Sequence, residues 1–185
     1  MGFRVQLIAV TGKAPDAIHR DLGLAPTGRF QDLPEAPYVG ANLPGGGYLL
    51  YINDPEAIAP DNGPFSRLSK GASLVACYAN ETVMDSYACA WVDGRERWRV
   101  LHLAGKGTDH VEASGDLPAE YPSIRDARLL SKSEGEDEVD YAFDVPVDLF
   151  AACGGIRYDQ DIPGAGPDPW EVLERRPKRR WFGLF

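Results

Sequence analysis

The chain has 185 residues, 44% of them hydrophobic and 25% charged, which is enough apolar material for one globular domain with a buried core. Its formal net charge of −9 argues against nucleic acid as a partner of the body, because a negative surface repels phosphates. No run of 18 apolar residues occurs, so we expect no transmembrane segment, and the first apolar run is too short for a signal peptide. The three cysteines, Cys77, Cys89 and Cys153, are odd in number and far apart, which favours reduced thiols and a cytoplasmic location.

The first part of the chain alternates between element signals and turn signals. Residues 3–10 alternate in polarity and predict a mostly buried strand, and Pro15 and Gly23 bracket a short helix. Residues 24–47 contain four prolines and three consecutive glycines. We therefore interpret them as a loop, with a short edge strand expected near residues 37–39.

A three-stranded antiparallel meander is the clearest structural signal in the chain. It follows an apolar strand at residues 48–52 and a short helix expected between Asn62 and Gly71. Asp93-Gly94 is a two-residue hairpin signal between two strand-like runs. The expected strands of the meander are residues 73–79, 83–92 and 95–103.

The pairing of the last two strands depends on the length of their turn. With a two-residue turn, Asp85 faces His102 and Cys89 faces Trp98, all on one side of the sheet. With a four-residue loop, Tyr87 faces His102 instead. The sequence leaves both registers open.

The second half of the chain continues the alternation of helices and strands. Pro122 and Pro146 each begin a helix, and the second helix stops at Gly154-Gly155. Short strands are expected at residues 110–112, 139–145 and 156–158.

These elements predict an α+β fold, with a mainly antiparallel sheet of five or six strands built around the 73–103 meander and helices packed on one face. Residues 1–162 form its single domain. Residues 163–185 are interpreted as a Pro/Gly linker, a short helix and a basic, aromatic tail. The short helix is expected because an acidic residue, a proline and a glutamate, beginning at Asp168, form a helix start signal.

Asp85 and His102 are the candidate catalytic pair. A carboxylate beside a histidine orients the ring and raises its basicity, as general acid–base catalysis requires. The sequence supplies no third group for this pair, so a structural role is the favoured interpretation. Cys89 lies on the neighbouring strand but several residues away from His102 along the sheet, so it is interpreted as a core thiol rather than as a nucleophile.

No residue pattern predicts a metal or a cofactor. His102, Asp109 and His110 cluster near one loop, and Asp159 and Asp161 form a D-x-D pair, but neither spacing is a known ligand pattern. The two glycine-rich loops do not lead from a strand into a helix, as a phosphate-binding loop does. We therefore expect neither a metal nor a cofactor.

The end of the sequence carries a net charge opposite in sign to that of the rest of the chain. Residues 171–185 hold five Lys and Arg against two Glu, a net charge of +3, so residues 1–170 carry −12. Burial of one large apolar side chain is worth about 1.5–3 kcal/mol, so we expect the tail to dock on its own body, a sister copy, another protein or an anionic membrane. The expected contact residues are Arg179, Arg180, Trp181, Phe182, Leu184 and Phe185.

The ending Trp-Phe-Gly-Leu-Phe at residues 181–185 resembles the short peptides ending in Leu-Phe that bind the bacterial replication sliding clamp. The resemblance covers five or six residues. It departs from the pattern of such peptides at its start, where Arg180 stands near the position of the usual glutamine. It implies that the tail docks on a protein partner.

Two functions remain open. The first is a bacterial-type cytoplasmic protein that acts by protein–protein binding, as an adaptor, a regulator or an immunity-like partner that neutralises a toxin. The acidic body, the docking tail and the lack of a complete catalytic motif favour it. The second is a small enzyme or ligand-binding domain that uses Asp85 and His102 in an aromatic-lined cleft. Binding without catalysis is the function we carry forward.

Overall fold

The computed structural model describes residues 2–53, 64–134 and 140–176, with the backbone alone for residues 131–134. The strands are β1 Arg4–Thr11, β2 Leu24–Gln31, β3 Tyr38–Asn42, β4 Tyr48–Ile52, β5 Ser73–Asn80, β6 Asp85–Val92, β7 Arg95–Leu103, β8 Glu112–Gly115 and β9 Trp170–Arg175. The helices are α1 Pro15–Leu22, α2 Pro64–Leu68, α3 Tyr121–Glu134 and α4 Asp144–Ala152, with short 3-10 helices η1 Ala104–Lys106 and η2 Tyr141–Phe143.

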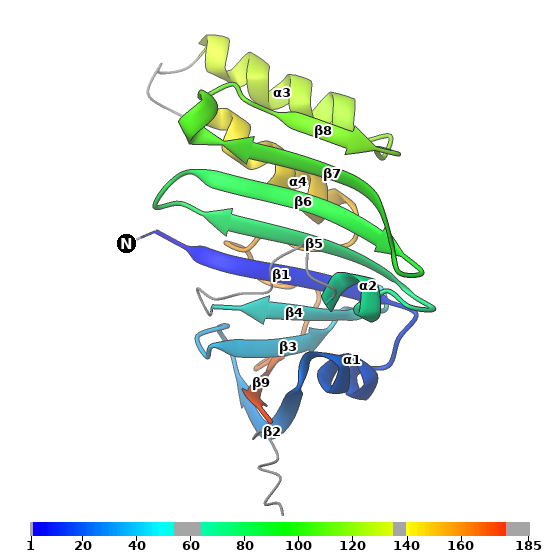
Figure 1. Ribbon diagram of the computed structural model, residues 1–185. Coiled ribbons are helices and arrows are strands. Elements are labelled where there is room, and N and C mark those ends of the chain that lie inside the picture. The colour runs from blue at the N-terminus through cyan, green and yellow to red at the C-terminus, as the bar shows by residue number, and fades with distance from the viewer. Residues whose placement is uncertain (1, 54–63, 135–139, 177–185) are drawn as a thin grey trace, which may run out of the picture.

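Within the described part of the chain, nine strands form one antiparallel sheet in the order β2-β9-β3-β4-β1-β5-β6-β7-β8 (Figure 1). The predicted meander is confirmed as β5, β6 and β7. β1 lies in the middle of the sheet, so the first strand of the chain pairs with β4 on one side and with β5 on the other. The sheet has more strands than the five or six expected, but the α+β class is confirmed.

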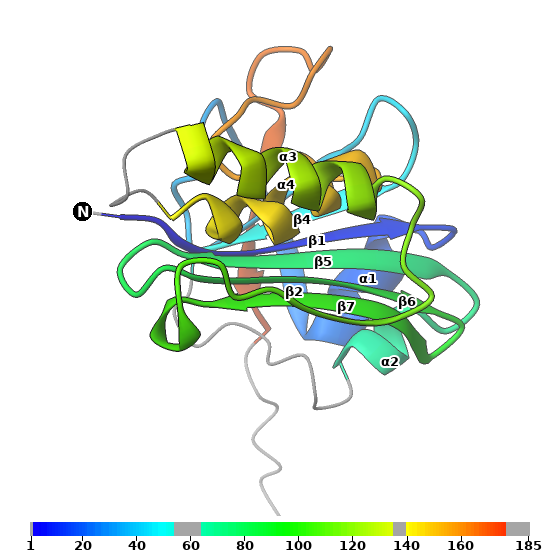
Figure 2. The ribbon, with the colours of Figure 1, turned by 90° about the horizontal axis from the view of Figure 1, so that it is seen from above.

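Helices cover both faces of the sheet (Figure 2). α3 and α4 lie on one face, and α1 and α2 lie on the other. The expectation that the helices pack on one face is therefore wrong. The physical reason lies in the central strand: Leu7 and Ile8 point to opposite faces of β1 and both are fully buried, so each face needs a cover.

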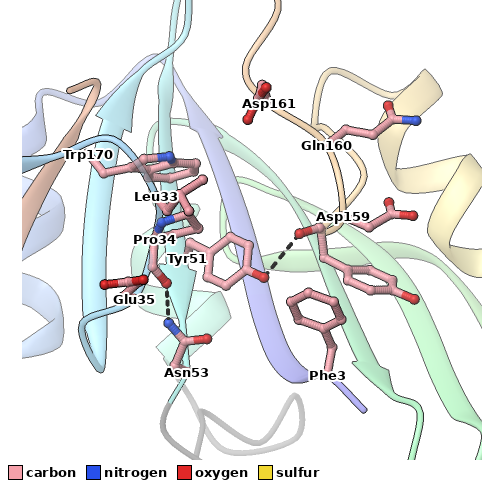
Figure 3. Close-up of a pocket in the computed structure, with 11 residues that line it drawn as sticks. Phe3, Leu33, Pro34, Glu35, Tyr51, Asn53, Asp159, Gln160, Asp161 and Trp170 are labelled. Atoms are coloured by element: carbon pink, nitrogen blue, oxygen red, sulfur yellow. Dashed lines mark hydrogen bonds between the residues drawn. The ribbon is translucent and has the colours of Figure 1, made fainter. Parts of the chain in front are cut away.

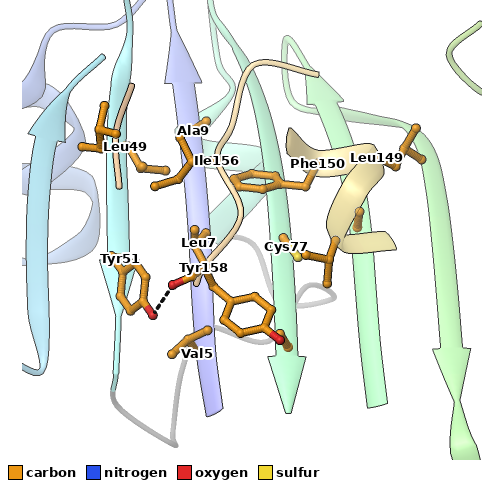
Figure 4. Close-up of a cluster of buried hydrophobic side chains, with 14 of the residues drawn as sticks. Val5, Leu7, Ala9, Leu49, Tyr51, Cys77, Leu149, Phe150, Ile156 and Tyr158 are labelled. Carbon is orange, nitrogen blue, oxygen red and sulfur yellow. Dashed lines mark hydrogen bonds between the residues drawn. The ribbon is translucent and has the colours of Figure 1, made fainter. Parts of the chain in front are cut away.

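The two faces of the sheet form two separate cores. Leu7 belongs to the core on the α4 side, which includes Phe150 (Figure 4). Ile8 belongs to the core on the opposite side, together with Ile18 of α1 and Phe65 of α2. The near-continuous apolar run of β1 is thus the sequence signature of a strand buried on both faces.

The segment expected as a C-terminal helix is strand β9. It is hydrogen-bonded between β2 and β3, where Val172 stands opposite Val39. Asp168 has a φ of 49°, so it is a left-handed turn residue rather than a helix cap. The helix start signal is local, whereas two strands distant in the sequence decide the conformation of this segment. The sheet therefore extends past the domain boundary expected at residue 162.

Three shorter segments also differ from expectation. Residues 24–47, expected as a loop, contain β2 and β3, and β3 lies inside the sheet instead of at its edge. In place of a strand, η2 follows Asp140, whose side chain accepts a hydrogen bond from the Phe143 N–H at 3.3 Å. Residues 156–158 lie outside any strand. Period-two patterns of three to seven residues do not separate strands from turns and short helices.

The hairpin between β6 and β7 has the two-residue turn that the sequence predicts. Asp93 and Gly94 have φ angles of 48° and 80°, as a type I′ turn requires. Arg97 is then an extra residue in β7, because Ala90 pairs with Trp98. Beyond this bulge, each pair is shifted by one residue and the side chains of β7 change face, so neither expected register is formed there.

A test of the packing between β3 and β4 uses Gly40. A Cβ added at Gly40 would lie 2.0 Å from the hydroxyl of Tyr48. We expect Gly40→Ala to lower the free energy of unfolding by about 1–3 kcal/mol, measured by urea denaturation. Gly45→Ala is the matched control, since no heavy atom lies within 4 Å of its added Cβ. Equal midpoints for the two variants would contradict this steric account.

Candidate functional site

Asp85 and His102 do not form the expected pair. Because of the bulge in β7, Ser86 stands opposite His102, and Asp85 stands opposite Leu103. Asp85 instead accepts a hydrogen bond from the backbone N–H of Ala104 at 3.1 Å. Its carboxylate therefore holds the end of β7 against β6.

The carboxylate partner of His102 is Asp140. The Nε2 atom of His102 lies 3.0 Å from Oδ2 of Asp140, and its Nδ1 atom lies 2.7 Å from the backbone oxygen of His110. The side chain of His102 has no exposed surface, and that of Asp140 is 7% exposed. A pair closed in this way fastens β7 to the chain before η2, and it leaves the imidazole of His102 no exposed surface on which to act as a general acid or base.

His110 forms a second, more exposed set of contacts beside this pair. Its Nδ1 accepts a hydrogen bond from the backbone N–H of Leu103 at 3.1 Å, so its Nε2–H donates to Glu112 at 2.9 Å. Hydrogen bonds from Lys106 and then from His110 lower the pKa of Glu112. Among the described residues, no three His, Cys, Asp or Glu side chains are grouped so as to hold a metal ion.

The cysteines are buried or half-buried thiols rather than activated nucleophiles. Cys89 stands opposite Arg99 and belongs to the core on the α1 side, so it does not approach His102 as a partner. Burial raises the pKa of Cys77. Burial, with a smaller effect of Glu120, raises the pKa of Cys153 to about 11. A thiol with a raised pKa carries little thiolate near neutral pH, and the thiolate is the nucleophile.

The expected contact residues of the tail lie outside the described residues. They are Arg179, Arg180, Trp181, Phe182, Leu184 and Phe185. The docking hypothesis for the tail therefore stays a prediction.

The structure adds a site that the sequence did not reveal. A cleft of about 550 Å³ opens where the chain enters β1, leaves β4 and enters β9, between the loops at residues 33–35 and 158–161 (Figure 3). Its aromatic residues are Phe3, Tyr51, Tyr158 and Trp170, and its carboxylates are Glu35, Asp159 and Asp161. We call it the acidic cleft. Its volume is within the range of ordinary ligand sites.

The aromatic wall of the acidic cleft is fixed by packing. The rings of Tyr51 and Trp170 meet edge to face with centroids 5.7 Å apart, and those of Phe3 and Tyr158 are tilted with centroids 5.3 Å apart. The Tyr51 hydroxyl donates a hydrogen bond to the backbone oxygen of Tyr158 at 3.1 Å. Phe3 is 46% exposed, whereas the other three rings are more than nine-tenths buried. The wall is therefore preformed, with Phe3 as its open edge.

Two polar side chains hold the sides of the acidic cleft in place. Glu81 accepts hydrogen bonds from the backbone N–H of Phe3 and from the hydroxyl of Tyr158, each at 2.8 Å. Asn53 donates to the backbone oxygens of Pro34 and Ala36, so it fastens the opposite loop to the end of β4. Each side of the cleft is thus tied to the sheet rather than left as a free loop.

The acidic cleft is negative. Among the described residues that line it, three are carboxylates and none is Lys, Arg or His. Asp159 pairs with Arg157 at 3.0 Å, whereas neither Glu35 nor Asp161 forms an ion pair with another described residue. Burial raises the pKa of Tyr51, and the carboxylates of Asp159 and Glu81 raise it further. The site therefore suits a cation with an apolar portion.

The sequence contains one local sign of this cleft. Asp159 and Asp161 form a D-x-D pair that is not a known metal-ligand pattern, and both lie exposed in the loop that the structure places at the cleft. The signal that points to the cleft is the tyrosine directly before them, because it places an aromatic ring next to the carboxylates. Phe3, Tyr51 and Trp170 are far apart in the sequence, so only the sheet order brings them together.

Comparisons of the chain with family models, with curated proteins and with solved structures found no match. Among the residues that the structure describes, no helix combines the length and the apolar character needed to cross a membrane. The function must therefore be argued from the geometry of the chain itself.

Removal of the Asp140 carboxylate tests the structural role of its pair with His102. Asp140→Ala leaves a buried imidazole nitrogen without its partner and also removes the acceptor for the Phe143 N–H. We expect a loss of about 2–4 kcal/mol in the free energy of unfolding, measured by denaturation at pH 7. Asp126→Ala is the control, since Asp126 forms an exposed ion pair on α3 and its loss should matter little. A stability equal to that of the control would show that the pair is dispensable.

His19 gives the fold a pH dependence. It is 2% exposed, its Nε2 lies 2.8 Å from the Tyr48 hydroxyl, and its Nδ1 has no partner among the described residues. Burial lowers the pKa of His19, against smaller opposing effects of Glu171 and Asp16. The unfolded chain, in which a histidine has a pKa of about 6.5, therefore binds the proton more readily, so stability contributed above pH 6.5 is lost as the pH falls.

We expect the free energy of unfolding of His19→Gln to depend less steeply on pH than that of the native chain between pH 7.5 and 5.5. One titrating group contributes at most about 1.4 kcal/mol per pH unit, which sets the upper limit of the difference in slope. Urea denaturation at several pH values measures both slopes. Identical slopes would mean that His19 takes up its proton equally well in the folded and unfolded chains.

Proposed function

We propose that the protein acts by protein–protein binding and that it recognises a basic segment of its partner in the acidic cleft. The observation that carries the proposal is the combination of a fixed aromatic wall with three carboxylates and no cationic lining residue among those described. Lys and Arg side chains have an apolar stem and a cationic head. The stem fits an aromatic wall, and the head fits carboxylates at its rim.

A protein partner would cover more of the exposed apolar surface of the cleft than a small cation would. Phe3 and Leu33 stand on its two sides and are 46% and 53% exposed. A lone ammonium or guanidinium group would leave this apolar surface in water. A peptide with an apolar residue beside its cation would cover it, at about 25 cal/mol for each Å² buried.

The proposal includes no catalytic step. The candidate acid–base residue His102 has no exposed side-chain surface and is occupied by Asp140 and the backbone of His110. Preformed walls of the kind described above lower the ordering cost of binding, which suits recognition. An adaptor, a regulator or an immunity-like partner would each use such a site.

We also propose a cytoplasmic location for this binding. None of the three cysteines forms a disulfide, and Cys77 and Cys89 are buried in the two cores. Reduced, buried thiols are typical of proteins from a reducing compartment.

The test is a calorimetric titration of the full chain with the hexapeptide (Arg-Trp)₃ at low ionic strength. We expect binding that weakens with added salt, because the contacts of Glu35 and Asp161 are exposed charge–charge contacts. Glu35→Gln combined with Asp161→Asn should bind about fivefold to thirtyfold more weakly, since two exposed charge contacts of about 0.5–1 kcal/mol each are lost. Asp126→Asn, which removes a carboxylate outside the cleft, should bind like the native chain.

Two outcomes would count against the proposal. Equal affinity of the native chain and of the doubly neutralised variant would show that the cleft does not hold the peptide. Binding of agmatine, a small guanidinium compound, as tight as that of the peptide would make the ligand a small organic cation rather than a protein.

A further inference from the structure

We infer that residues 177–185 of the chain occupy the acidic cleft of the same copy, where they compete with the basic segment of a partner. The inference rests on the proposed function, because it assigns an internal competitor to that binding site. It joins two observations. The chain continues for nine residues beyond Arg176, the last residue that the structure describes, and those nine residues carry the cations that the described lining of the cleft lacks.

The chemistry of residues 177–185 complements that of the cleft. Lys178, Arg179 and Arg180 give the segment a charge of +3 with no Asp or Glu, whereas three of the lining residues of the cleft are carboxylates. Trp181 and Phe182 follow the cations directly, and the cleft has exposed apolar surface on both of its sides (Figure 3). The segment therefore carries both kinds of group that the proposed function requires of a partner.

The register between β3 and β9 brings one carboxylate of the cleft close to the end of β9. Tyr38, the first residue of β3, stands opposite Leu173 in an antiparallel pair. The residues before Tyr38 therefore lie in the direction in which the chain continues after Leu173. In that direction, the Nε of Arg175 donates a hydrogen bond to the hydroxyl of Tyr38 at 2.7 Å. Glu35 precedes Tyr38 by three residues, which is at most about 10 Å of backbone.

The loop that carries Glu35 and the end of β9 are both held in place. Asn53 donates hydrogen bonds to the backbone oxygens of Pro34 and Ala36, the two neighbours of Glu35. The backbone N–H and the Nε of Arg176 donate to two backbone oxygens at the entry to β2, each at 2.8 Å. Both ends of the distance that the tail must cross are therefore fixed by the sheet.

The length of the tail is sufficient for this distance. Residues 178–180 can extend about 7–14 Å from Arg176, which includes the surroundings of Glu35. A short tether of this kind gives a segment an effective concentration on the order of millimolar at its site. A second copy of the chain would offer its tail at that concentration only in a millimolar protein solution. The tail of the same copy is therefore the favoured occupant.

Competition between the tail and an added peptide tests the inference in the full chain. The tail variant is Lys178→Gln with Arg179→Gln and Arg180→Gln. The control variant removes the same charge from exposed ion pairs outside the cleft, with the substitutions Arg97→Gln, Lys106→Gln and Arg125→Gln.

We expect the tail variant to bind the hexapeptide (Arg-Trp)₃ at least about fivefold more tightly than the control variant does. A site that its own tail leaves open for about one-fifth of the time has an apparent Kd about five times its intrinsic Kd. Calorimetric titration at low ionic strength measures both affinities. Equal affinities of the two variants would overturn the inference.

A disulfide reporter shows whether the contact lies within one copy. Leu33→Cys lies at the cleft, where the native side chain is 53% exposed, and is combined with Gly183→Cys in the tail. We expect mild oxidation of dilute protein to give a cross-linked monomer, seen on non-reducing gels, at least about tenfold faster than for Val92→Cys combined with Gly183→Cys.

Val92 is a matched position because its side chain is 45% exposed, but β6 lies five strands away from β9 in the sheet. Both pairs keep the three native cysteines, so these contribute equally. Equal rates for the two pairs, or cross-linked dimers without cross-linked monomers, would overturn the inference.

The titrations also separate this inference from the proposed function. Glu35→Gln with Asp161→Asn weakens the contact with the tail as well as that with the hexapeptide, so its full effect on peptide binding is expected in the tail variant, where the tail no longer competes. If the neutralised cleft loses affinity there while the tail and control variants bind alike, the proposed function stands and the inference fails. If neutralisation of the cleft changes nothing in the tail variant, both fail.

Discussion

The insertion of β9 between β2 and β3 is the constraint on which the rest of the site depends. This strand pairs on both sides, and its neighbours add contacts to it, for example the Thr27 hydroxyl that donates to the Val172 oxygen at 2.8 Å. At its far end, Arg175 donates to the hydroxyl of Tyr38 and lies over the same ring, with 5.2 Å between its guanidinium carbon and the ring centroid. A strand held in this way fixes both ends of its segment. One end carries Trp170 into the acidic cleft, and the other is held at Arg175 against Tyr38.

The acidic cleft is a product of strand ends rather than of one loop. Phe3 precedes the central strand, Tyr51 lies in the neighbouring β4, and Trp170 begins β9. Tyr51 and Trp170 are anchored in a core that the sheet needs in any case, so this part of the aromatic wall adds little conformational cost of its own, whereas Phe3 is half-exposed. The carboxylates lie on the connecting loops, where solvent can hydrate them while no ligand is bound. The strands therefore supply the packed aromatic wall, and the loops supply the charged groups for recognition.

The bulge at Arg97 shows how one residue redirects a candidate site. Without it, the two-residue turn would set Asp85 opposite His102, as one of the two predicted registers has it. With it, His102 turns into the other core and takes Asp140, which lies 38 residues further along the chain, as its partner. Asp85 keeps a structural role at a backbone N–H. A catalytic pair predicted from the register of a hairpin is correct only if no bulge shifts that register.

Several features of the protein follow from the sequence alone, because their causes are local. The turn at Asp93-Gly94, the helix between Pro15 and Gly23, the apolar central strand and the α+β class all come from side-chain periodicity and from backbone preferences of single residues. The separation of a negative body from a basic segment is also a property of the sequence. The tertiary structure decided those features that depend on contacts between residues far apart in the sequence. Trp170 begins a strand rather than a helix because two other strands hydrogen-bond to it on either side, and the second face of the sheet needed its own helices because β1 is apolar on both faces. The acidic cleft exists only where residues near 3, 51, 158 and 170 meet, and no local pattern encodes that meeting.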